Sequence, residues 1–298
     1  MKPDSKEWER WRRAARVAAE ARELGASLLA PGTRRRDVAD RVEEYIRSHG
    51  AQPAFPTNLS RNVEAAHFTP PPDDEEVFQS GDLVKVDVGA HIDGAIADTA
   101  MTVEVGGGRR HENLTRAVRE GVEAGIAEVR AGVAVDALSR AIERAITARG
   151  VKPVTNLTGH TIETYLLHGG KSIPNAGGMS AAQLEEGEIV AIEPFATNGR
   201  GRIENGPFGN IVRFPKDPSE AAPKLAPLFE RFRTLPFTAR WVDDPAERAL
   251  LTRSRRFLQT YPVFVESGGG LVAQAEHTVL VRRDDAEVLT RAGPSSAP

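Results

Sequence analysis

Apolar and polar residues recur along the chain with two different periods, and these periods predict helices and strands. Apolar residues at helical spacing predict an amphipathic helix over 7–29 that ends near Pro31-Gly32. Its apolar face is expected to include Trp8, Trp11, Ala15, Val17 and Ala18. The same spacing predicts helices at 37–49 and 135–149, closed by Gly50 and Gly150, and further helices at 113–130, 223–232 and 244–261.

Strand-like segments separate these helices. They lie at 83–90, 95–105, 159–167, 188–197, 211–214 and 271–282, and a proline-rich loop lies at 62–72. The order helix, helix, hairpin, helix, helix, strands predicts an α+β fold in which strands pair locally and helices lie outside. Residues 212–262 contain no histidine, are rich in arginine and proline, and interrupt two strand-like segments. We therefore expect one domain over 1–298 with a helical insertion at 212–262.

The first strand pair carries the most informative acids of the chain. Asp93-Gly94 suits a two-residue hairpin turn because both residues tolerate positive φ. Gly89 then faces Asp98, and Asp87 shares a face with Asp98 as a diagonal neighbour, roughly 7 Å or less away at Cβ. Gly89 is expected to leave room between the acids for ions. Two acids that face one gap need a cation or a proton. The alternative is a solvated hairpin face with two ordinary acids.

Two more carboxylates interrupt apolar strand patterns. Glu193 follows a run of four apolar residues, and Glu276 is embedded in the last strand. Lone carboxylates in such strands rarely lie against apolar walls without a partner. In the last strand Gln274, Glu276 and Thr278 share a face, so His277 points the other way and is interpreted as structural. The alternative for both glutamates is an exposed strand face.

Composition narrows the class of protein. The 298 residues are 40% hydrophobic and 27% charged, which is ordinary for a globular protein. A net charge of −3 provides no basic field for nucleic acid, and no apolar run approaches the roughly 18 residues that span a bilayer. The N-terminal residues 1–16 contain no signal-peptide core. Cysteine is absent, which excludes disulfides and thiolate ligands. We expect a cytoplasmic monomer without membrane or nucleic-acid partners.

Three of the seven histidines lie in polar or loop contexts. His160 has small, polar neighbours, His168 precedes two glycines, and His67 lies in the predicted loop. Each could be a ligand, a proton shuttle, a substrate clamp or plain surface. Together, four carboxylates and one imidazole without any thiolate suit a pair of divalent cations such as Mn²⁺, Fe²⁺, Co²⁺ or Zn²⁺. Two such ions roughly 3.5–4 Å apart can share carboxylates and a hydroxide.

Over nearly its whole length the chain resembles the methionine aminopeptidases, in the type 2 form found in archaea and eukaryotes. The motifs that carry the resemblance are Phe55-Pro56-Thr57-Asn58-Leu59-Ser60, Ala65-Ala66-His67-Phe68-Thr69-Pro70, the hairpin of Asp87 and Asp98, Gly159-His160 with Leu167-His168-Gly169-Gly170-Lys171, Ala191-Ile192-Glu193-Pro194-Phe195, Ala273-Gln274-Ala275-Glu276-His277-Thr278, and in the insertion Thr234-Leu235-Pro236-Phe237 with Arg240-Trp241. The chain lacks the long charged extension of the eukaryotic enzymes and their histidine in the insertion, so it resembles the archaeal form.

The resemblance implies a fold, a cofactor and a reaction. The fold is the pita-bread fold, in which two pseudo-symmetric α–β halves surround a curved antiparallel sheet. The implied ligands of two divalent ions (Co, Mn, Fe or Zn) are Asp87, Asp98, His160, Glu193 and Glu276, with Asp98 and Glu276 bridging both ions. The reaction is removal of the initiator methionine from nascent proteins and peptides, by attack of a hydroxide that bridges the metals on the first peptide bond.

The resemblance also implies roles for individual side chains. Glu193 resembles the carrier of a proton from the attacking water to the leaving amine. His67 and His168 resemble histidines that bind the scissile amide and stabilise the oxyanion-like intermediate. The expected walls of the methionine side-chain pocket are Phe55, Leu167 and Tyr261.

Two other interpretations share parts of this pattern. An X-Pro dipeptidase or aminopeptidase has the same fold and ligands but usually an extra N-terminal domain, for which the segment before the hairpin leaves no room. A non-catalytic relative that binds protein or RNA generally loses metal ligands, whereas all five are present here. Peptides and nascent chains that begin with methionine are therefore the expected partners. Whether the protein contacts the ribosome is left open.

Overall fold

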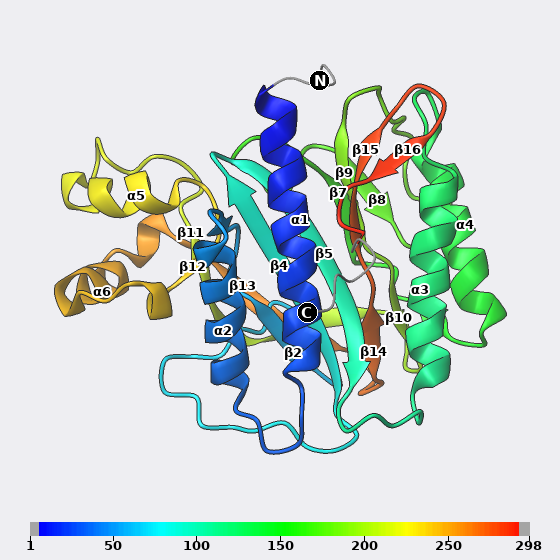
Figure 1. The fold of residues 1–298 in the computed structure, drawn as a ribbon, viewed down its shortest axis with the longest axis horizontal. Coiled ribbons are helices and arrows are strands. Elements are labelled where there is room, and N and C mark those ends of the chain that lie inside the picture. Colours follow the sequence, from blue (N-terminus) through cyan, green and yellow to red (C-terminus); the bar gives the residue numbers. More distant parts are fainter. Residues whose placement is uncertain (1–5, 292–298) are drawn as a thin grey trace.

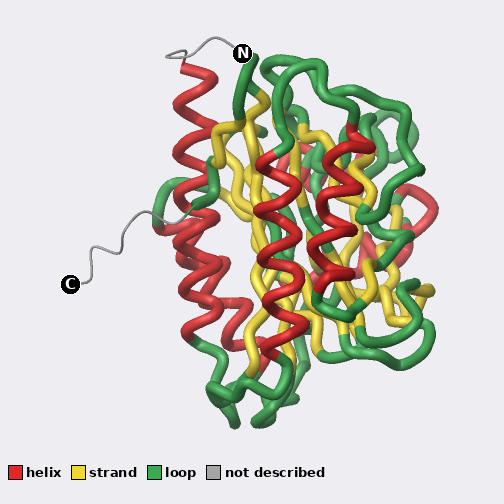
Figure 2. The backbone as a smooth tube through the Cα atoms, turned by 90° about the vertical axis from the view of Figure 1, so that its right-hand side faces the viewer, coloured by secondary structure: helices red, strands yellow, loops and turns green. Residues whose placement is uncertain are grey.

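The computed structural model describes residues 6–291, in which helices and strands form separate layers. In Figure 1, α1 (Lys6–Ser27) and α2 (Arg35–Ser48) lie in front of the strands, whereas α3 (Glu112–Ala127) and α4 (Val135–Ala148) lie at the right, the side that faces the viewer in Figure 2. The strand pairs among the described residues are antiparallel, which confirms the predicted α+β class. Within the described residues, no helix is both long enough and apolar enough to cross a membrane.

The helices and strands have the following bounds. The helices are α1 (Lys6–Ser27), α2 (Arg35–Ser48), α3 (Glu112–Ala127), α4 (Val135–Ala148), α5 (Ala226–Phe232) and α6 (Pro245–Arg253), with 3₁₀ turns at Pro223–Leu225, Ala239–Trp241 and Arg255–Phe257. The strands up to the hairpin are β1 (Gln52–Pro53), β2 (Asn58–Arg61), β3 (Glu64–Ala66), β4 (Leu83–Ile92) and β5 (Ala95–Glu104). The later strands are β6 (Lys152–Pro153), β7 (Thr158–Ile162), β8 (Ser172–Pro174), β9 (Ile189–Ile192), β10 (Phe195–Thr197), β11 (Ile203–Arg213), β12 (Phe237–Thr238), β13 (Gln259–Glu266), β14 (Val272–Gln274), β15 (His277–Val281) and β16 (Ala286–Val288).

Helix α1 is the long amphipathic helix that the apolar spacing predicts. All five residues expected on its apolar face are buried, and they are Trp8, Trp11, Ala15, Val17 and Ala18. Its alanine-rich face lies against β4 and β5 with the apolar residues of α2, and together they form one hydrophobic core. A second core joins α3 and α4 to the strands of the later half. Each helix pair therefore covers its own strands.

The two halves repeat the same local structure. Residues 31–53 and 131–153 each consist of a turn, a helix of fourteen residues and a two-residue strand. Both helices end at the predicted glycines, Gly50 (φ 74) and Gly150 (φ 71), whose N–H groups donate to carbonyls of the last helical turn. A left-handed φ favours glycine at this position, because glycine has no Cβ to clash. The chain thus contains the two related α–β halves that were expected.

The β4–β5 hairpin has the predicted register. Gly89 pairs with Asp98, Asp87 pairs with Ala100, and both turn residues have positive φ, 49° at Asp93 and 83° at Gly94. The hairpin is joined to the later half at Ala100, whose carbonyl accepts the backbone N–H of Glu276 at 2.9 Å. The last strand segment therefore lies beside the hairpin that carries the first two acids.

Several predicted bounds are wrong. The predicted helix 244–261 ends at Arg253, and Tyr261 lies on β13, which pairs with β11. Strand β11 starts at Ile203 rather than at 211, because register shifts near Phe208 let the strand continue through a segment rich in glycine and proline. The predicted loop 62–72 contains the short strand β3. The predicted strands 188–197 and 271–282 are each broken, just before Glu193 and Glu276 respectively.

The segment between β11 and β13 contains α5, α6 and β12. In Figure 1, α5 and α6 lie at the left, away from the four long helices. The segment has a hydrophobic cluster of its own, formed by Phe214, Leu225, Leu228, Phe229, Phe232, Phe237, Val242 and Leu251. Leu235 belongs instead to the cluster of Phe55 and Leu167 in the body of the protein. The segment therefore reaches the main body through its middle part.

Candidate metal centre

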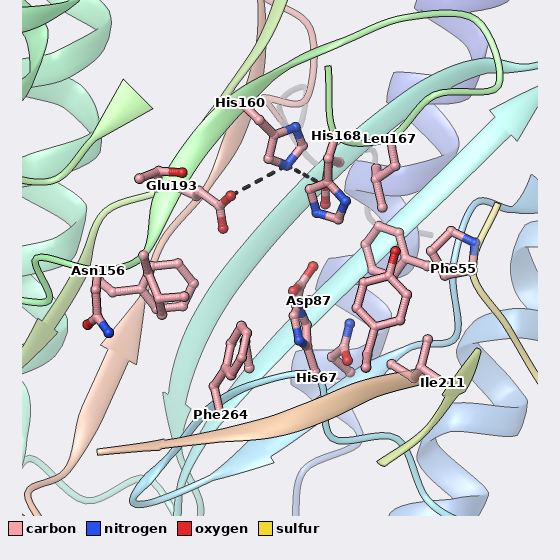
Figure 3. A pocket seen from close by; sticks show the side chains of 18 residues that line it. Phe55, His67, Asp87, Asn156, His160, Leu167, His168, Glu193, Ile211 and Phe264 are labelled. Carbon is pink, nitrogen blue, oxygen red and sulfur yellow. Dashed lines mark ion pairs between the residues drawn. The ribbon is translucent and has the colours of Figure 1, made fainter. Parts of the chain in front are cut away.

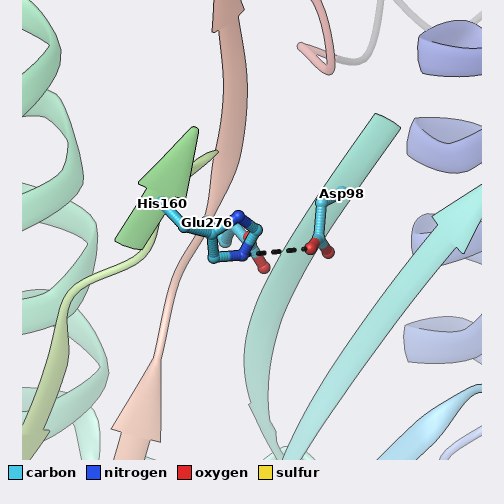
Figure 4. A group of neighbouring side chains, drawn as sticks. All are labelled: Asp98, His160 and Glu276. Atoms are coloured by element: carbon cyan, nitrogen blue, oxygen red, sulfur yellow. Dashed lines mark ion pairs between the residues drawn. The ribbon is translucent and has the colours of Figure 1, made fainter. Parts of the chain in front are cut away.

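The five side chains predicted as ligands come from five different strands or strand ends. Asp87 is on β4, Asp98 on β5 and His160 on β7, while Glu193 follows β9 and Glu276 lies between β14 and β15. The ligand atoms of Asp98, His160 and Glu276 all lie within 4.8 Å of one another (Figure 4). The Nε2 atom of His160 is 3.8 Å from Asp98 Oδ2 and 3.4 Å from Glu193 Oε1 (Figure 3). Asp87 lines the same cavity. The structure thus brings all five together.

Backbone and hydroxyl contacts hold the two halves of this cluster in place. The Thr278 hydroxyl accepts from the Asp98 N–H at 2.8 Å and donates to the Asp98 carbonyl at 2.7 Å. The Thr99 hydroxyl donates to the Glu276 carbonyl at 2.9 Å. These bonds fix the main chain on which Asp98 and Glu276 are carried, so their carboxylates face each other in one rigid frame.

The carboxylates are buried without enough hydrogen-bond donors. Asp87, Asp98 and Glu276 are 8%, 5% and 1% exposed, and each has one buried oxygen with no hydrogen-bond partner. Burial raises the pKa of Asp87 to about 7. Burial and the neighbouring carboxylates raise the pKa of Asp98, Glu193 and Glu276 well above the usual range. Four acids cannot share this space as anions without compensating positive charge or protons.

His160 adds a neutral donor atom to this cluster. Burial lowers its pKa to about 3, so the imidazole is neutral at pH 7. Its Nδ1 lies 3.3 Å from the Thr161 carbonyl, which can only accept, so the ring proton belongs on Nδ1. The Nε2 lone pair then faces the oxygens of Asp98 and Glu193. A cation between these atoms removes the repulsion, and oxygen ligands with one imidazole suit divalent metals. The residues present therefore fit a metal site.

The electrostatics of the cluster lead to a prediction for the metal-free protein. An acid whose pKa is raised by folding takes up a proton on folding, so its contribution to stability is lost as the pH rises through the folded pKa. Glu276→Gln removes one such acid. At pH 8 the metal-free variant should have a larger free energy of unfolding than the metal-free wild type, by on the order of a few kcal/mol. This difference should be smaller at pH 5. Urea unfolding in chelator at both pH values measures this difference, and a variant less stable than wild type at pH 8 would contradict it.

A cavity of about 210 Å³ lies beside the acids. It is lined by every other predicted site residue, namely Phe55, His67, Leu167, His168 and Tyr261. Further walls that the pattern analysis did not identify are Asn58, Ala66, Asn156, Leu157, Thr158, Phe195, Ile211, Pro236 and Phe264. Glu276 does not line the cavity and is almost completely buried. The charged end of the cavity is thus next to an apolar one.

The two predicted substrate histidines lie at different depths. His67 is half-buried between the rings of Tyr261 and Phe264, with centroids 5.2 and 4.5 Å away, and has the unusual φ of 66°. His168 is exposed, and its ring lies 4.5 Å from that of His160. Both face the cavity without belonging to the tight cluster of ligand atoms.

Gln274 and His277 flank Glu276 and have different surroundings. The Gln274 side chain donates to Glu193 Oε2 at 3.4 Å, a contact that the sequence analysis missed although it placed Gln274 on the face of Glu276. His277 instead bonds the Thr290 hydroxyl at 2.9 Å. It therefore lies away from the cluster, in keeping with the structural role expected for it.

The expectation for Gly89 is wrong. A Cβ atom built on this glycine would lie 2.2 Å from a ring carbon of Phe55. The space above Gly89 is therefore filled by the Phe55 ring and is not left for ions. The glycine lets an aromatic wall of the cavity pack directly on the strand that carries Asp87.

This packing predicts the effect of Gly89→Ala. The added methyl group must displace Phe55, and overpacking of this kind costs about 1–3 kcal/mol. Urea unfolding should show that loss. Gly170→Ala is the matched control, because a Cβ atom there meets nothing within 4 Å and its φ is not positive. Equal stability of both variants would show that Phe55 moves without cost.

Known proteins resemble this chain over most of its length. The profile of Metallopeptidase family M24 matches residues 9–283. The methionine aminopeptidase of Archaeoglobus fulgidus is 44% identical over 283 residues, covering 93% of this chain and 96% of that protein. The methionine aminopeptidase of Methanothermobacter thermautotrophicus is 40% identical over 293 residues, covering 95% and 98%.

Solved structures share the fold. The methionine aminopeptidase of Thermotoga maritima superposes with a TM-score of 0.72 at 25% identity and covers 97% of this chain and 98% of its own. A thermophilic Arx1 has a TM-score of 0.82 at 16% identity, covering 100% and 93%. The prolidase of Pyrococcus furiosus has a TM-score of 0.65 at 18% identity, and the match covers 99% of this chain but 66% of the prolidase.

Proposed function

The chain belongs to metallopeptidase family M24, and from this premise we infer that it is a methionine aminopeptidase, which removes the initiator methionine from proteins and peptides. Its mixed helices and antiparallel sheets have the pita-bread arrangement of that family. The observation that carries the inference is the cluster of buried carboxylates and one imidazole at the end of an apolar cavity. Relatives of 36–44% identity over most of the chain support the same activity.

The proposed cofactor is a pair of divalent ions, Co, Mn, Fe or Zn. The residues that would hold them are Asp87, Asp98, His160, Glu193 and Glu276. Such ions supply Lewis-acid chemistry, because they polarise a carbonyl and acidify water toward neutral pH. The partnerless oxygens of Asp87, Asp98 and Glu276 support this assignment.

Glu193 is the proposed carrier of the proton. It is the ligand with the largest exposed fraction, 13% of its side chain, and it lines the cavity. As a carboxylate it could accept a proton from an attacking water and then deliver this proton to the leaving amine. The Gln274 amide contacts its Oε2 atom and limits the rotation of the carboxyl group.

The apolar end of the cavity is the proposed methionine pocket. Phe55, Leu167 and Tyr261 line the cavity together with Ile211 and Pro236, which supports this proposal. An unbranched, polarizable thioether fits such a wall of aromatic and aliphatic groups. His67 and His168, which also face the cavity, are proposed to bind the scissile amide and its oxyanion-like intermediate.

Further properties complete the proposal. We propose the type 2 subtype in its archaeal form, in a single domain with 212–262 as a helical insertion. The separate hydrophobic cluster of α5 and α6 and the archaeal relatives support this assignment. We also propose a cytoplasmic monomer that acts on nascent chains. Sedimentation of the protein with and without ribosomes tests both the oligomeric state and any contact with the ribosome.

One experiment tests the function. The purified protein is loaded with Co²⁺, Mn²⁺ or Fe²⁺ and offered Met-Ala-Ser and Ala-Pro peptides in parallel. We expect cleavage after methionine and none of Ala-Pro. Cleavage of Ala-Pro alone would make the protein an X-Pro peptidase, and cleavage of neither peptide would favour a binding protein of the same fold.

A further inference from the structure

Glu43 on α2 is a completely buried carboxylate outside the metal centre. Four N–H groups donate to it. Arg240 provides two, both at 2.7 Å, the Trp241 indole provides one at 2.6 Å, and the backbone of Thr57 provides one at 3.1 Å. The arginine side chain is itself 4% exposed, so this is a buried, two-pronged ion pair between α2 and the segment that contains α5 and α6.

The donors lie close in sequence to residues that form separate walls of the substrate cavity. Thr57 lies two residues after Phe55, whose ring packs on Gly89. Arg240 lies four residues after Pro236, a wall residue from a different part of the chain. Arg240 also contacts the hydroxyl of Thr69, two residues after His67, at 3.4 Å. Glu43 and Arg240 together therefore connect three segments that line the cavity.

The chemistry of the Glu43–Arg240 pair is better suited to fixing the position of the groups it connects than to raising the free energy of unfolding. A guanidinium that donates both prongs to one carboxylate fixes distance and orientation at once. A buried ion pair is a weak source of net stability, since apolar residues of similar volume are often equally stable, but it specifies which groups meet. Asp40 also accepts from Arg240, but its side chain is 42% exposed, so solvent weakens this second ion pair.

We propose that Glu43 and Arg240 are a positioning pair that holds the Phe55 and Pro236 walls at a fixed separation and so sets the selectivity of the pocket for an unbranched side chain of methionine length. This inference rests on the proposed function. Neither residue touches the metal ligands or the reacting atoms. Loss of the pair widens the apolar end of the cavity and leaves the acids and His160 in place.

The test compares Glu43→Gln with the double variant Glu43→Gln/Arg240→Met. The double variant leaves no unpaired buried charge, so an effect that both variants share comes from the lost positioning of the walls and not from a charge left without a partner. Glu44→Gln is the matched control on the same helix, because its side chain is 74% exposed. The metal-loaded enzymes are assayed on Met-Ala-Ser and Ala-Ala-Ser peptides. Amide hydrogen exchange at 55–58 and 234–238 is measured on the same samples.

We expect KM for the methionine peptide to rise about tenfold in both variants, the loss expected for hydrogen bonds to a charged group, with kcat within a factor of about two. The preference for methionine over alanine should fall by the same factor, and exchange at 55–58 and 234–238 should accelerate. Folded variants that keep both the preference and the slow exchange would overturn the proposal. A wild type without any methionine preference would contradict the function instead, and the exchange data would still decide whether Glu43 positions the walls.

Discussion

Glu276→Ala is expected to abolish metal binding and activity together. Its carboxylate is 1% exposed, lies within 4.8 Å of the ligand atoms of Asp98 and His160, and has an oxygen with no protein partner. Without it the proposed metal site would lose one of its ligands, and kcat/KM should fall by roughly a thousandfold or more. Metal content after dialysis, the rise in melting temperature on metal addition, and peptide cleavage measure the three consequences. The wild type should gain melting temperature with metal by mass action, and the variant should not.

Glu266→Gln is the matched control for this experiment. Glu266 is also a buried glutamate, 4% exposed, but its oxygens accept backbone N–H groups, including those of Gly201 at 3.1 Å and Gly270 at 2.9 Å. It should lose stability and keep metal and turnover. If Glu276→Ala keeps its full metal content, Glu276 is not a ligand.

His67→Ala is expected to keep the metal and lose turnover. Burial lowers the pKa of His67 to about 4, so the ring is neutral at pH 7. Its Nδ1 lies 3.3 Å from the Pro262 carbonyl and must carry the proton, which leaves Nε2 as an acceptor toward the cavity. Such an atom can hold the N–H of the scissile amide. Its removal should lower kcat roughly a hundredfold or more, with unchanged metal content.

The backbone conformation of His67 makes a second substitution necessary besides alanine. Its φ of 66° is left-handed, where alanine is strained and asparagine is tolerated. His67→Asn should therefore fold like the wild type and show the same loss of turnover. His49→Ala, at an exposed histidine, is the control that should change neither property. Loss of metal from either His67 variant would mean that the histidine belongs to the metal centre.

Local pattern predicts the hairpin but not what packs on it. The register of Asp87 and Asp98 follows from the Asp93-Gly94 turn, and each of these residues is close to the others along the chain. The neighbour of Gly89 is different, because Phe55 reaches it from a segment that the hairpin pattern does not contain. The acids could therefore be placed from the sequence, while the use of the space between them could not.

Tyr261 shows a second kind of failure. Its place on the cavity wall follows from the resemblance to a family, and the structure places it there. The apolar spacing nevertheless predicts a helix at Tyr261, because the apolar residues before it continue the spacing of α6. The strand β13 pairs with β11, which precedes the whole helical segment, and with β3, which lies still earlier in the chain. Pairing of distant strands overrides the local period.

Glu43 could not have been selected from the sequence at all. It is one of several acids in the predicted helix 37–49, and nothing in their spacing distinguishes it. Its partner Arg240 lies 197 residues further along the chain. A buried ion pair of this range leaves no periodic signal, so only the three-dimensional structure identifies it.

The contact between the hairpin and the Glu276 segment affects when the cluster of acids becomes complete during protein synthesis. The Thr99 hydroxyl and the Glu276 carbonyl meet across 177 residues of chain. During synthesis the hairpin acids leave the ribosome long before Glu276, so the cluster of acids is incomplete until the final strands have emerged, and a growing copy of this protein is expected to be inactive. Contacts of such long range also slow folding. Divalent ions that bind this cluster would stabilise only the finished chain, because only the finished chain contains all of the acids and His160.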